Sequence, residues 1–570
     1  MDNASDLSIV LSGEAGQGLK TLELIFAKIV KSNGLHVFTY TEFMSRIRGG
    51  NNTTEIRVSP RPCSAFVDRI DIAVSFQKQG LKRIANRISA DTVVIGERET
   101  LDETFTHGAS VNEVALSSLA KESGGAFMLN TVAMGMLSAL LCFEQDPAIA
   151  ILKASLKRRD PTILENNEKA FLKGYAQGQR IRSSVTLGCP KQDGASAADN
   201  HLLYGSDSIG IGALAGGCNF VSAYPMSPAT SVLEFLAGRA SEFGVIVEQA
   251  EDEIAAINMA LGSWYAGGRA LVSTAGGGFA LMEEGLSLAG CIESPLVIHV
   301  GQRPGPATGL PTRTEQGDLN LALYAGHGEF PRVIFAPATL EDGIDLTGRA
   351  FNLADKYQVP VFVLTDQYFI DSSATMAEVD LEQCGQENQF IRTDSEYKRF
   401  ELTESGISPR GIPSYGDGMV CVDSDEHDEW GCITEDFDMR TSMVDKRVRK
   451  LEALTREAIA PRFVGPQTYT HVVVGWGSTF AGLKEALERC TRKDVALLHF
   501  SQVYPVHADA ARLLGSAAHR IVVENNATAQ FGALLTRETG LPFHKKICKY
   551  NGMPFSVEEL TEEITKLYVE

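Results

Sequence analysis

The feature that most constrains the fold is an alternation of short, mostly apolar runs with helix-like stretches between residues 201 and 370. The runs at 270–274, 296–300 and 359–364 lack the strict polar–apolar alternation of a strand with one solvated face. Buried strands that alternate with helices predict a parallel sheet covered by helices on both faces. We therefore predict an α/β domain over 201–370.

Similar patterns flank this domain. An apolar run near residue 7 leads through a glycine-rich turn into a helix-like stretch, and strand-like runs return after residue 466. At about 150 residues per domain, the 570 residues leave room for three or four domains. The predicted organisation is an α/β domain over 1–185, a linker over 186–200, the central domain over 201–370, an irregular acidic connection with a basic helix over 371–465, and a third α/β domain over 466–570.

The charge balance excludes several functions. The chain has 52 basic and 72 acidic residues and a net charge of −20, which repels phosphate backbones and anionic membrane surfaces. No apolar run reaches the roughly 18 residues that span a bilayer, and the first residues lack the pattern of a signal peptide. We expect no nucleic-acid partner, no membrane and a cytoplasmic location.

The ten cysteines are scattered and form no CxxC pair, so zinc-ribbon, thioredoxin-type and iron–sulfur ligation find no support. We expect buried thiols in a reducing compartment, no metal site on this chain, and any electron-carrying cluster on another chain. The GDG at 416–418 lacks the asparagine of a metal–diphosphate motif, since the next asparagine is Asn525. The acidic run at 423–429 is more typical of a solvated loop than of a cation site.

The glycine turn at 13–18 resembles two motifs and fits neither. Leucine follows Gly18 where a P-loop needs lysine, and the order GxxGxG is not the dinucleotide fingerprint GxGxxG. Glycines before a helix still let backbone N–H groups approach an anion. The turn is therefore either a site for a phosphate-bearing ligand or a tight turn alone, and a nucleotide-binding dehydrogenase is a weaker alternative for the whole chain.

Three charged residues follow predicted strands of the central domain. Glu253 begins a helix directly after a strand, where open α/β sheets bind ligands, and it is either catalytic or a helix-capping charge. Arg303 and Arg313 lie on a Pro/Gly-rich loop that leaves the strand at 296–300. Guanidinium groups bind carboxylates with two hydrogen bonds, so the pair is either a carboxylate site or a set of surface ion pairs.

Several segments together resemble the 2-oxoacid:ferredoxin oxidoreductases. YPMSPAT at 224–230 is similar to the family signature YPITPST, and the resemblance continues through 247–262, STAGGGFALMEEGLSLAG at 273–290, 301–332 and IVVENNATAQFGALL at 521–535. The N-terminal GEAGQG and FMSRIRGGNNTTEIRVS resemble the family's γ domain, fused here ahead of an α domain. The segments GPATGLPTRTEQGD and GHGEFP are most similar to the 2-oxoglutarate branch.

The resemblance implies an α subunit of a thiamine-diphosphate enzyme, with a pyrimidine-type domain and a transketolase C-terminal-like domain. The implied reaction interconverts 2-oxoglutarate and coenzyme A with succinyl-CoA and carbon dioxide, as in 2-oxoglutarate synthase; pyruvate or branched-chain 2-oxoacids are the alternative substrates. A separate β subunit would carry Mg²⁺ and a 4Fe–4S cluster, electrons would pass to or from ferredoxin, and the assembly would be α2β2.

The resemblance also implies residue roles. Glu253 would hydrogen-bond the aminopyrimidine ring of the cofactor and promote the tautomer that activates it. Arg303 would face the substrate carboxylate, and Arg313 is a candidate for the distal carboxylate of 2-oxoglutarate. The other implied site residues are Ser227 for substrate, Tyr224, Pro225 and Gly277 for thiamine diphosphate, and Gly16, Gln17 and Gly18 for coenzyme A.

Some positions depart from the family pattern. Met226 and Ser227 replace isoleucine and threonine, although Ser227 keeps a hydroxyl. Gly277 stands where proline is frequent, and Ala529 stands where glycine is usual. The substitution at Ala529 weakens any ligand role for its loop. A non-catalytic scaffold subunit is disfavoured because Glu253 and Arg303 are both present.

Overall fold

The computed structural model describes residues 6–44, 50–156, 160–192 and 196–567. Residues 45–49, within the γ-like motif, and 193–195, within the expected linker, lie outside the described residues. The chain divides into two compact units: Met1–Leu203 with Ser372–Glu378 and Ser556–Glu558, and Tyr204–Asp371 with Val379–Phe555 and Glu559–Glu570. The finer division into five segments stays a prediction.

The first unit is built on an eight-stranded sheet that is parallel in one half and antiparallel in the other. In order across the sheet its strands are β6 (Ser110–Glu113), β5 (Val93–Gly96), β4 (Ile72–Ser75), β1 (Leu7–Gly13), β3 (Asn52–Ser59), β2 (His36–Glu42), β14 (Ser372–Met376) and β7 (His201–Tyr204). Its helices are α1 (Leu19–Ser32), α2 (Gly80–Ile84), α3 (Leu116–Glu122), α4 (Leu129–Leu140), α5 (Gln145–Ser155) and α6 (Pro161–Arg182).

Close packing of α4 against α6 explains two interior glycines of α6. A β-carbon at Gly174 would lie 1.9 Å from the carbonyl oxygen of Val132, and one at Gly178 would lie 2.3 Å from that of Met136. Glycine costs about 0.5–1 kcal/mol relative to alanine inside a helix. Here that cost is offset by the close approach of the two backbones.

The expectation of isolated thiols is wrong at one place. Cys142 and Cys189 form a disulfide although 47 positions separate them, while Cys218 and six further described cysteines are free. Cys142 lies two residues after the end of α4, and Cys189 lies beyond the end of α6. The packing of those helices brings the two residues together, and no sequence motif marks the pairing.

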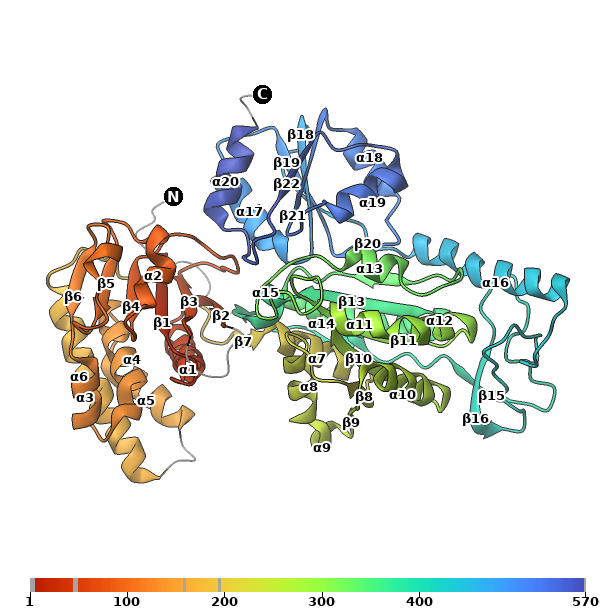
Figure 1. The fold of residues 1–570 in the computed structure, drawn as a ribbon, viewed down its shortest axis with the longest axis horizontal. Helices are drawn as coiled ribbons and strands as arrows, with labels where there is room; N and C mark the ends of the chain where they lie inside the picture. The colour runs from red at the N-terminus through yellow and green to blue at the C-terminus, as the bar shows by residue number, and fades with distance from the viewer. Residues whose placement is uncertain (1–5, 45–49, 157–159, 193–195, 568–570) are drawn as a thin grey trace. The chain divides into compact units, whose positions relative to one another are not determined.

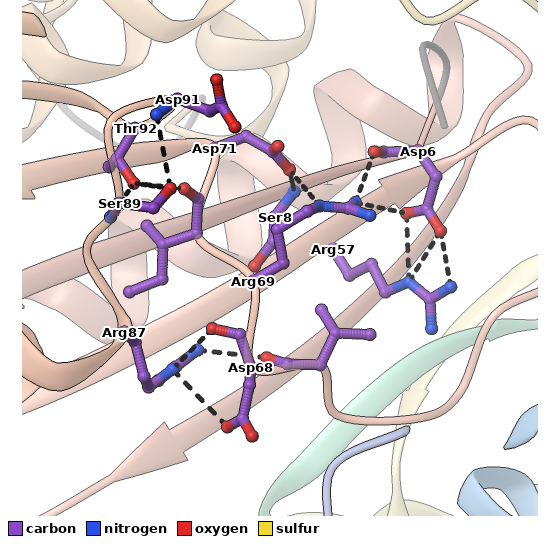
Figure 2. Close-up of polar contacts among 12 residues, drawn as sticks. Asp6, Ser8, Arg57, Asp68, Arg69, Asp71, Arg87, Ser89, Asp91 and Thr92 are labelled. Atoms are coloured by element: carbon purple, nitrogen blue, oxygen red, sulfur yellow. Dashed lines mark hydrogen bonds and ion pairs between the residues drawn. The ribbon is translucent and has the colours of Figure 1, made fainter. Parts of the chain in front are cut away.

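Ion pairs fix the beginning of β1 (Figure 2). Asp6 accepts a hydrogen bond of 2.6 Å from the Arg57 guanidinium, and the backbone carbonyl of Asp6 accepts one from Arg69. Asp71 accepts from the backbone N–H of Ser8 at 2.7 Å and from Arg69 at 3.0 Å. Burial raises the pKa of Asp71, while Arg69 and the Ser8 N–H lower it. This network links β1, β3 and the segment that leads into β4.

The second unit contains a seven-stranded sheet that confirms the expected parallel α/β fold. Its neighbouring strands are parallel except that β20 runs antiparallel to β12. Across the sheet the strands are β20 (Gln502–Tyr504), β12 (Val333–Phe335), β13 (Pro360–Asp366), β11 (Leu296–Gln302), β10 (Ala270–Ala275), β8 (Phe220–Ala223) and β9 (Ile246–Gln249). Its helices include α7 (Gly205–Ala215), α8 (Thr230–Ala237), α10 (Glu253–Tyr265), α11 (Gly276–Phe279), α12 (Glu283–Cys291), α13 (Leu319–Tyr324) and α14 (Leu340–Tyr357).

A five-stranded sheet completes the second unit. Figure 1 shows it in blue, with α17 and α20 on one side and α18 and α19 on the other. Its strands are β17 (Arg462–Val464), β19 (Val495–Phe500), β18 (His471–Trp476), β21 (His519–Glu524) and β22 (Lys545–Cys548), parallel except at β17. Its helices are α17 (Phe480–Arg489), α18 (Asp509–Gly515), α19 (Gln530–Thr539) and α20 (Val557–Lys566).

The acidic connection is more ordered than its composition suggests. It contributes β14 to the first unit, forms the parallel pair β15 (Phe390–Thr393) and β16 (Arg410–Gly416), and ends in α16 (Phe437–Arg456). The basic helix, expected from the sequence at Arg440 to Arg456, begins at Phe437, where Asp436 caps it by accepting from the Met439 N–H. Lys446 and Lys450 of α16 are fully buried and pair with the two carboxylate oxygens of Glu293, which follows α12.

No single helix among the described residues is long and apolar enough to cross a membrane. One bent pair of helices, Leu116–Glu122 with Ala126–Leu140, passes a test of length and composition only. The longer helix of this pair contains α4, and most residues of α4 are buried in the core of the first unit.

Candidate active site

Four loops of the second unit meet at one edge of its large sheet. The neighbouring strands β11, β10, β8 and β9 are parallel, so their carboxyl ends lie at the same edge. The loops that follow them carry Tyr224 to Ser227, Glu253, the glycines at 276–278, and Arg303. This is the edge at which open α/β sheets bind ligands, and it brings together most of the residues expected from the sequence.

Glu253 is the first residue of α10, and its carboxyl group turns into the protein. Its side chain is only 3% exposed, and Oε1 has no hydrogen-bond partner among the described residues. The helix is capped by its neighbour Asp252, whose carboxylate accepts from the Ala255 N–H at 2.7 Å. A buried carboxyl oxygen without a donor is costly, so the arrangement is what an absent polar ligand would complete.

The glycine segment at the start of α11 forms the floor below this carboxyl group. A β-carbon at Gly278 would lie 2.5 Å from Oε1 of Glu253, and one at Gly276 would lie 2.3 Å from Oδ2 of Asp318. At Gly277 the nearest atom would be the Ala307 carbonyl oxygen, 3.8 Å away. The close approaches therefore depend on Gly276 and Gly278, which the sequence reasoning did not select, and not on Gly277.

This contrast gives a matched pair of variants. Gly278→Ala is expected to displace the Glu253 carboxyl and lower kcat/KM by about tenfold or more, since misplacing a reacting group by about 1 Å can cost up to about a hundredfold. Gly277→Ala is expected to have a smaller effect, because the nearest atom to its β-carbon, the Ala307 carbonyl oxygen, would lie 3.8 Å away, an ordinary contact distance. Steady-state kinetics, with melting curves for both variants, test this; equal effects would contradict it.

Arg303 leaves the end of β11 and reaches the loop after β8. Its Nη1 donates to the carbonyl oxygen of Ser227 at 2.7 Å. Burial lowers the pKa of Arg303, and the nearby carboxylate of Asp318 partly restores it. Ser227 and Tyr224 are exposed and Pro225 is half-buried. The guanidinium therefore lies against the loop after β8, at the sheet edge where the loop that carries Glu253 also begins.

Asp318 is the group at this edge that sequence reasoning missed. It directly precedes α13 but does not cap it. Its Oδ2 is inaccessible and has no hydrogen-bond partner among the described residues. Burial raises the pKa of Asp318 to about 6, against a lowering by Arg303. An aspartate just before a helix is normally interpreted as a cap. The sequence pattern therefore did not indicate that this carboxyl group is buried.

Arg313 lies farther along the same loop. Its backbone N–H donates to Leu310 and its Nη1 to the carbonyl of Thr312 at 3.4 Å. A β-carbon at Gly552 would lie 3.1 Å from Cβ of Arg313. The arginine is therefore placed against the C-terminal part of this unit, and its assignment to a substrate carboxylate stays a prediction.

The expected coenzyme A turn lies in the first unit and is braced by its own side chains. Gly16 and Gly18 have φ of 89° and 74°, which favours glycine. The Gln17 side chain accepts from the Glu14 N–H at 2.8 Å, and Asn130 donates to the Gln17 carbonyl at 2.7 Å. The N-terminus of α1 follows with no side-chain cap.

A cavity of about 320 Å³ lies beside this turn, lined by α1 and the helices that pack on it. Asn130 borders the cavity and also holds the turn. The polar part of the cavity lining consists of Thr21, Asn130, Thr131 and Asn167. Sequence reasoning missed Asn130 because it is remote from the glycines along the chain.

Comparison with known proteins places these features in a family. Residues 211–446 match the family described as pyruvate flavodoxin/ferredoxin oxidoreductase, thiamine diP-bdg, and residues 8–177 match pyruvate ferredoxin/flavodoxin oxidoreductase. A 2-oxoacid:ferredoxin oxidoreductase subunit alpha from Sulfolobus sp is 31% identical over 98% of this chain and 97% of its own. The 2-oxoglutarate synthase subunit KorA from Archaeoglobus fulgidus is 31% identical over 57% of this chain and 88% of its own.

A solved structure is similar over nearly the whole chain. It is the 2-oxoglutarate:ferredoxin oxidoreductase from Magnetococcus marinus with 2-oxoglutarate, coenzyme A and succinyl-CoA bound. It is 29% identical, with a TM-score of 0.91 over 99% of both chains. The agreement covers both compact units and therefore the complete set of sheets described above.

Proposed function

Because this chain belongs to the 2-oxoacid:ferredoxin oxidoreductases, as an alpha subunit, we propose that it acts on 2-oxoglutarate. The reaction converts 2-oxoglutarate and coenzyme A to succinyl-CoA and carbon dioxide while two electrons pass to ferredoxin, or runs in reverse. The name of the Archaeoglobus fulgidus relative and the ligands in the Magnetococcus marinus structure support this substrate. Pyruvate and branched-chain 2-oxoacids are the alternatives within the family.

The observation that carries the proposal is the buried Glu253 carboxyl over Gly278, with an oxygen that lacks a donor. A thiamine diphosphate pyrimidine ring offers a nitrogen that pairs with such a carboxyl group, and the residues present fit it. We propose that Glu253, the segment at 276–278, Tyr224 and Pro225 hold the cofactor. When bound, the cofactor supplies a carbon nucleophile for the decarboxylation of a 2-oxoacid.

The residues of this chain divide the remaining tasks. Glu253 holds a proton at the ring nitrogen, and its burial keeps water from competing for that position. Arg303 pairs with the carboxylate shared by all 2-oxoacids, and the Ser227 hydroxyl donates to the same group. Arg313 pairs with the distal carboxylate that only 2-oxoglutarate carries, because an unpaired buried charge is costly.

Exposed apolar side chains around Glu253 support a protein partner at this edge. Tyr224 is 41% exposed, Ile254 52% and Leu281 54%, and they follow β8, β9 and β10 at the carboxyl ends of these strands. Large apolar side chains gathered at one place are typical of protein interfaces. We propose that a β subunit covers this edge, carries Mg²⁺ and a 4Fe–4S cluster, exchanges electrons with ferredoxin, and assembles as α2β2.

We propose that the first unit contributes to coenzyme A binding through Gly16, Gln17 and Gly18. The positive end of the helix dipole at the start of α1 favours an anion, and Asn130 holds the turn that precedes this helix end.

The proposal is tested with the complex of this chain and its β subunit, by following ferredoxin reduction with a panel of 2-oxoacids. We expect the highest kcat/KM with 2-oxoglutarate and no turnover by this chain alone. A higher kcat/KM with pyruvate would replace the substrate assignment. Absence of turnover with every 2-oxoacid, in a complex loaded with cofactor and cluster, would contradict the proposed function.

Substrate choice provides a sharper prediction. Arg313→Met is expected to weaken the use of 2-oxoglutarate by about 2 kcal/mol or more, the scale for breaking a hydrogen-bonded charge pair. The use of pyruvate or 2-oxobutyrate should change little or improve. The readout is the ratio of kcat/KM values for the two substrates, and Arg61→Met, an arginine of the first unit, is the control. An unchanged ratio would assign the distal carboxylate to another residue.

A further inference from the structure

We infer that the exposed side of helix α10 is a docking surface for a helix of the β subunit, and that Gly262 is the point where the two helix backbones come closest. The inference rests on the proposed function and deepens it, since it names the surface that holds the proposed partner. It follows from the residues that α10 exposes, from the open space beside Gly262, and from the place where the exposed side begins.

Helix α10 has no charged residue after Glu253, although one of its sides is exposed. Its inner side carries Ile257, Leu261 and Trp264, which are buried in the core of the second unit. A helix without a charged side is normally buried on all sides, so we expect another chain to cover the exposed one. The exposed residues of the helix are Ile254, Asn258, Met259, Gly262 and Tyr265.

These exposed residues lie together on one side of the helix, and we call them the α10 stripe. An α-helix turns by roughly 100° per residue, so the stripe falls within roughly 140° of the circumference, with Gly262 near its middle. The stripe is therefore continuous along the helix, and its centre carries no side chain. A second helix can approach the α10 backbone most closely at that point.

The space beside Gly262 shows that this chain does not itself require a glycine there. A β-carbon at Gly262 would meet no atom within 4 Å, and glycine is a poor helix former. The first unit shows where such a glycine is needed: β-carbons at Gly174 and Gly178 of α6 would lie 1.9 and 2.3 Å from carbonyl oxygens of α4. The glycine of α10 suits the same kind of close helix contact, with a partner outside this chain.

The beginning of the stripe identifies the partner. Ile254 directly follows Glu253, and Tyr224 and Leu281 are exposed at the same edge of the sheet. A β subunit that covers the cofactor at this edge therefore contacts Ile254. A stable interface takes roughly 800 Å² from each partner, and the α10 stripe is an uncharged surface that continues from the edge. The same subunit is therefore the occupant that we assign to the whole stripe.

The far end of the stripe continues onto a neighbouring loop. The Tyr265 hydroxyl donates to the carbonyl oxygen of Val420 at 2.9 Å, which holds this loop beside the end of α10. Met419 on the loop is 81% exposed, and Tyr415 is also exposed. Apolar side chains therefore extend beyond the helix, and the docking surface consists of the α10 stripe together with Met419 and Tyr415.

The test measures the assembly of the full chain with its β subunit by analytical ultracentrifugation. Gly262→Leu and Met259→Lys are each expected to raise the Kd of the complex about tenfold or more, because the first fills the close contact and the second places a charge in it. The controls are Gly515→Leu, at an exposed helix glycine whose β-carbon would lie 3.8 Å from its nearest neighbour, and Val448→Lys, at a side chain 41% exposed against 39% for Met259. Both controls should change the Kd by less than about twofold.

The melting temperature of the chain without its partner separates docking from folding. Gly262→Ala should leave this temperature unchanged or raise it, because alanine is the better helix former and its β-carbon would meet no atom of this chain. If Gly262→Leu does not fold, Gly262→Ala and Met259→Lys are compared with the controls in its place.

Three results would overturn the inference. The first is an unchanged Kd for the α10 variants. The second is a lower melting temperature for Gly262→Ala, which would mean that this chain itself packs against the glycine. The third is a loss of self-association with an unchanged Kd for the β subunit, which would assign the stripe to a second copy of this chain. Failure of the proposed function is seen separately, as absent turnover by the unmodified complex.

Discussion

Glu253→Ala in the assembled complex is expected to reduce kcat by about a hundredfold or more, the scale for loss of a positioned proton-transfer group. The structure explains why this should be an effect on chemistry and not on folding. Oε1 makes no hydrogen bond among the described residues, and Asp252 caps the helix. Removing the side chain therefore costs no capping bond and relieves a buried, unpaired carboxyl oxygen.

The neighbouring acidic residues supply the controls. Glu251 and Asp252 are exposed and precede Glu253 directly. Glu251→Ala is expected to leave both kcat and the melting temperature unchanged. Asp252→Ala should cost about 1 kcal/mol of stability through loss of the cap, with a much smaller effect on kcat than Glu253→Ala. Near-normal turnover by a folded Glu253→Ala complex would contradict the catalytic role and leave Glu253 only a structural one.

The arrangement of the site follows from local patterns that the sequence displays. Apolar runs followed by glycine, acidic or basic turns predict strands whose carboxyl ends carry polar groups, and parallel pairing places those ends at one edge. Glu253 and Arg303 are found together at that edge. Parallel strand direction alone places the two residues at the same edge, and this is a general property of parallel sheets.

Other parts of the molecule depend on contacts that no local pattern encodes. β3 was not predicted because NTTEIRVS mixes polar and charged residues, yet it lies in the middle of a sheet, where Glu55 pairs with Arg87 at 2.7 Å. β14 pairs with β2 across more than three hundred positions of the chain. The disulfide of Cys142 and Cys189 depends on helix packing in the same way. A single sequence gives neither the partner nor the register of such contacts.

Asp318 and Ala529 show the same limit at single residues. The backbone N–H of Asp318 donates to the Gln302 side chain, and Gln316, two positions earlier, accepts from the Asn525 N–H, so the placement of Asp318 depends on tertiary contacts. Ala529, noted as a departure from the family's glycine, has a φ of 56°, a backbone conformation that favours glycine. The sequence analysis drew from this departure only a weaker ligand role for the loop, and the left-handed backbone conformation was not predicted.

The stability of the second unit is expected to depend strongly on Glu293, and Glu293→Gln should lower the free energy of unfolding by about 3–5 kcal/mol, the cost of leaving buried charges uncompensated. The carboxylate pairs with Lys446 at 2.5 Å and with Lys450, and all three side chains are about 1% exposed. Arg399 also donates to the Glu293 carbonyl at 2.8 Å. The substitution would leave two buried ammonium groups without an anion.

The dependence on pH separates this mechanism from a packing defect. Burial alone would raise the pKa of Glu293, but Lys450 and Lys446 hold it well below its usual range. A carboxyl whose folded pKa is depressed contributes stability above its unfolded pKa of about 4.3 and loses that contribution as pH falls below it. The difference between wild type and Glu293→Gln should therefore be full near neutral pH and shrink in acid, as measured by denaturant unfolding.

A surface pair provides the control for this interpretation. Glu457 pairs with Lys356 at 2.6 Å, but both side chains are about 40% exposed, so Glu457→Gln should cost no more than about 1 kcal/mol. If Glu293→Gln behaved like the surface variant, the buried charges would have to be compensated by another group. If its cost were large but independent of pH, lost packing would explain it. A large cost that fades only in acid is the result that the charge triad alone predicts, because only the ionised carboxylate compensates Lys446 and Lys450.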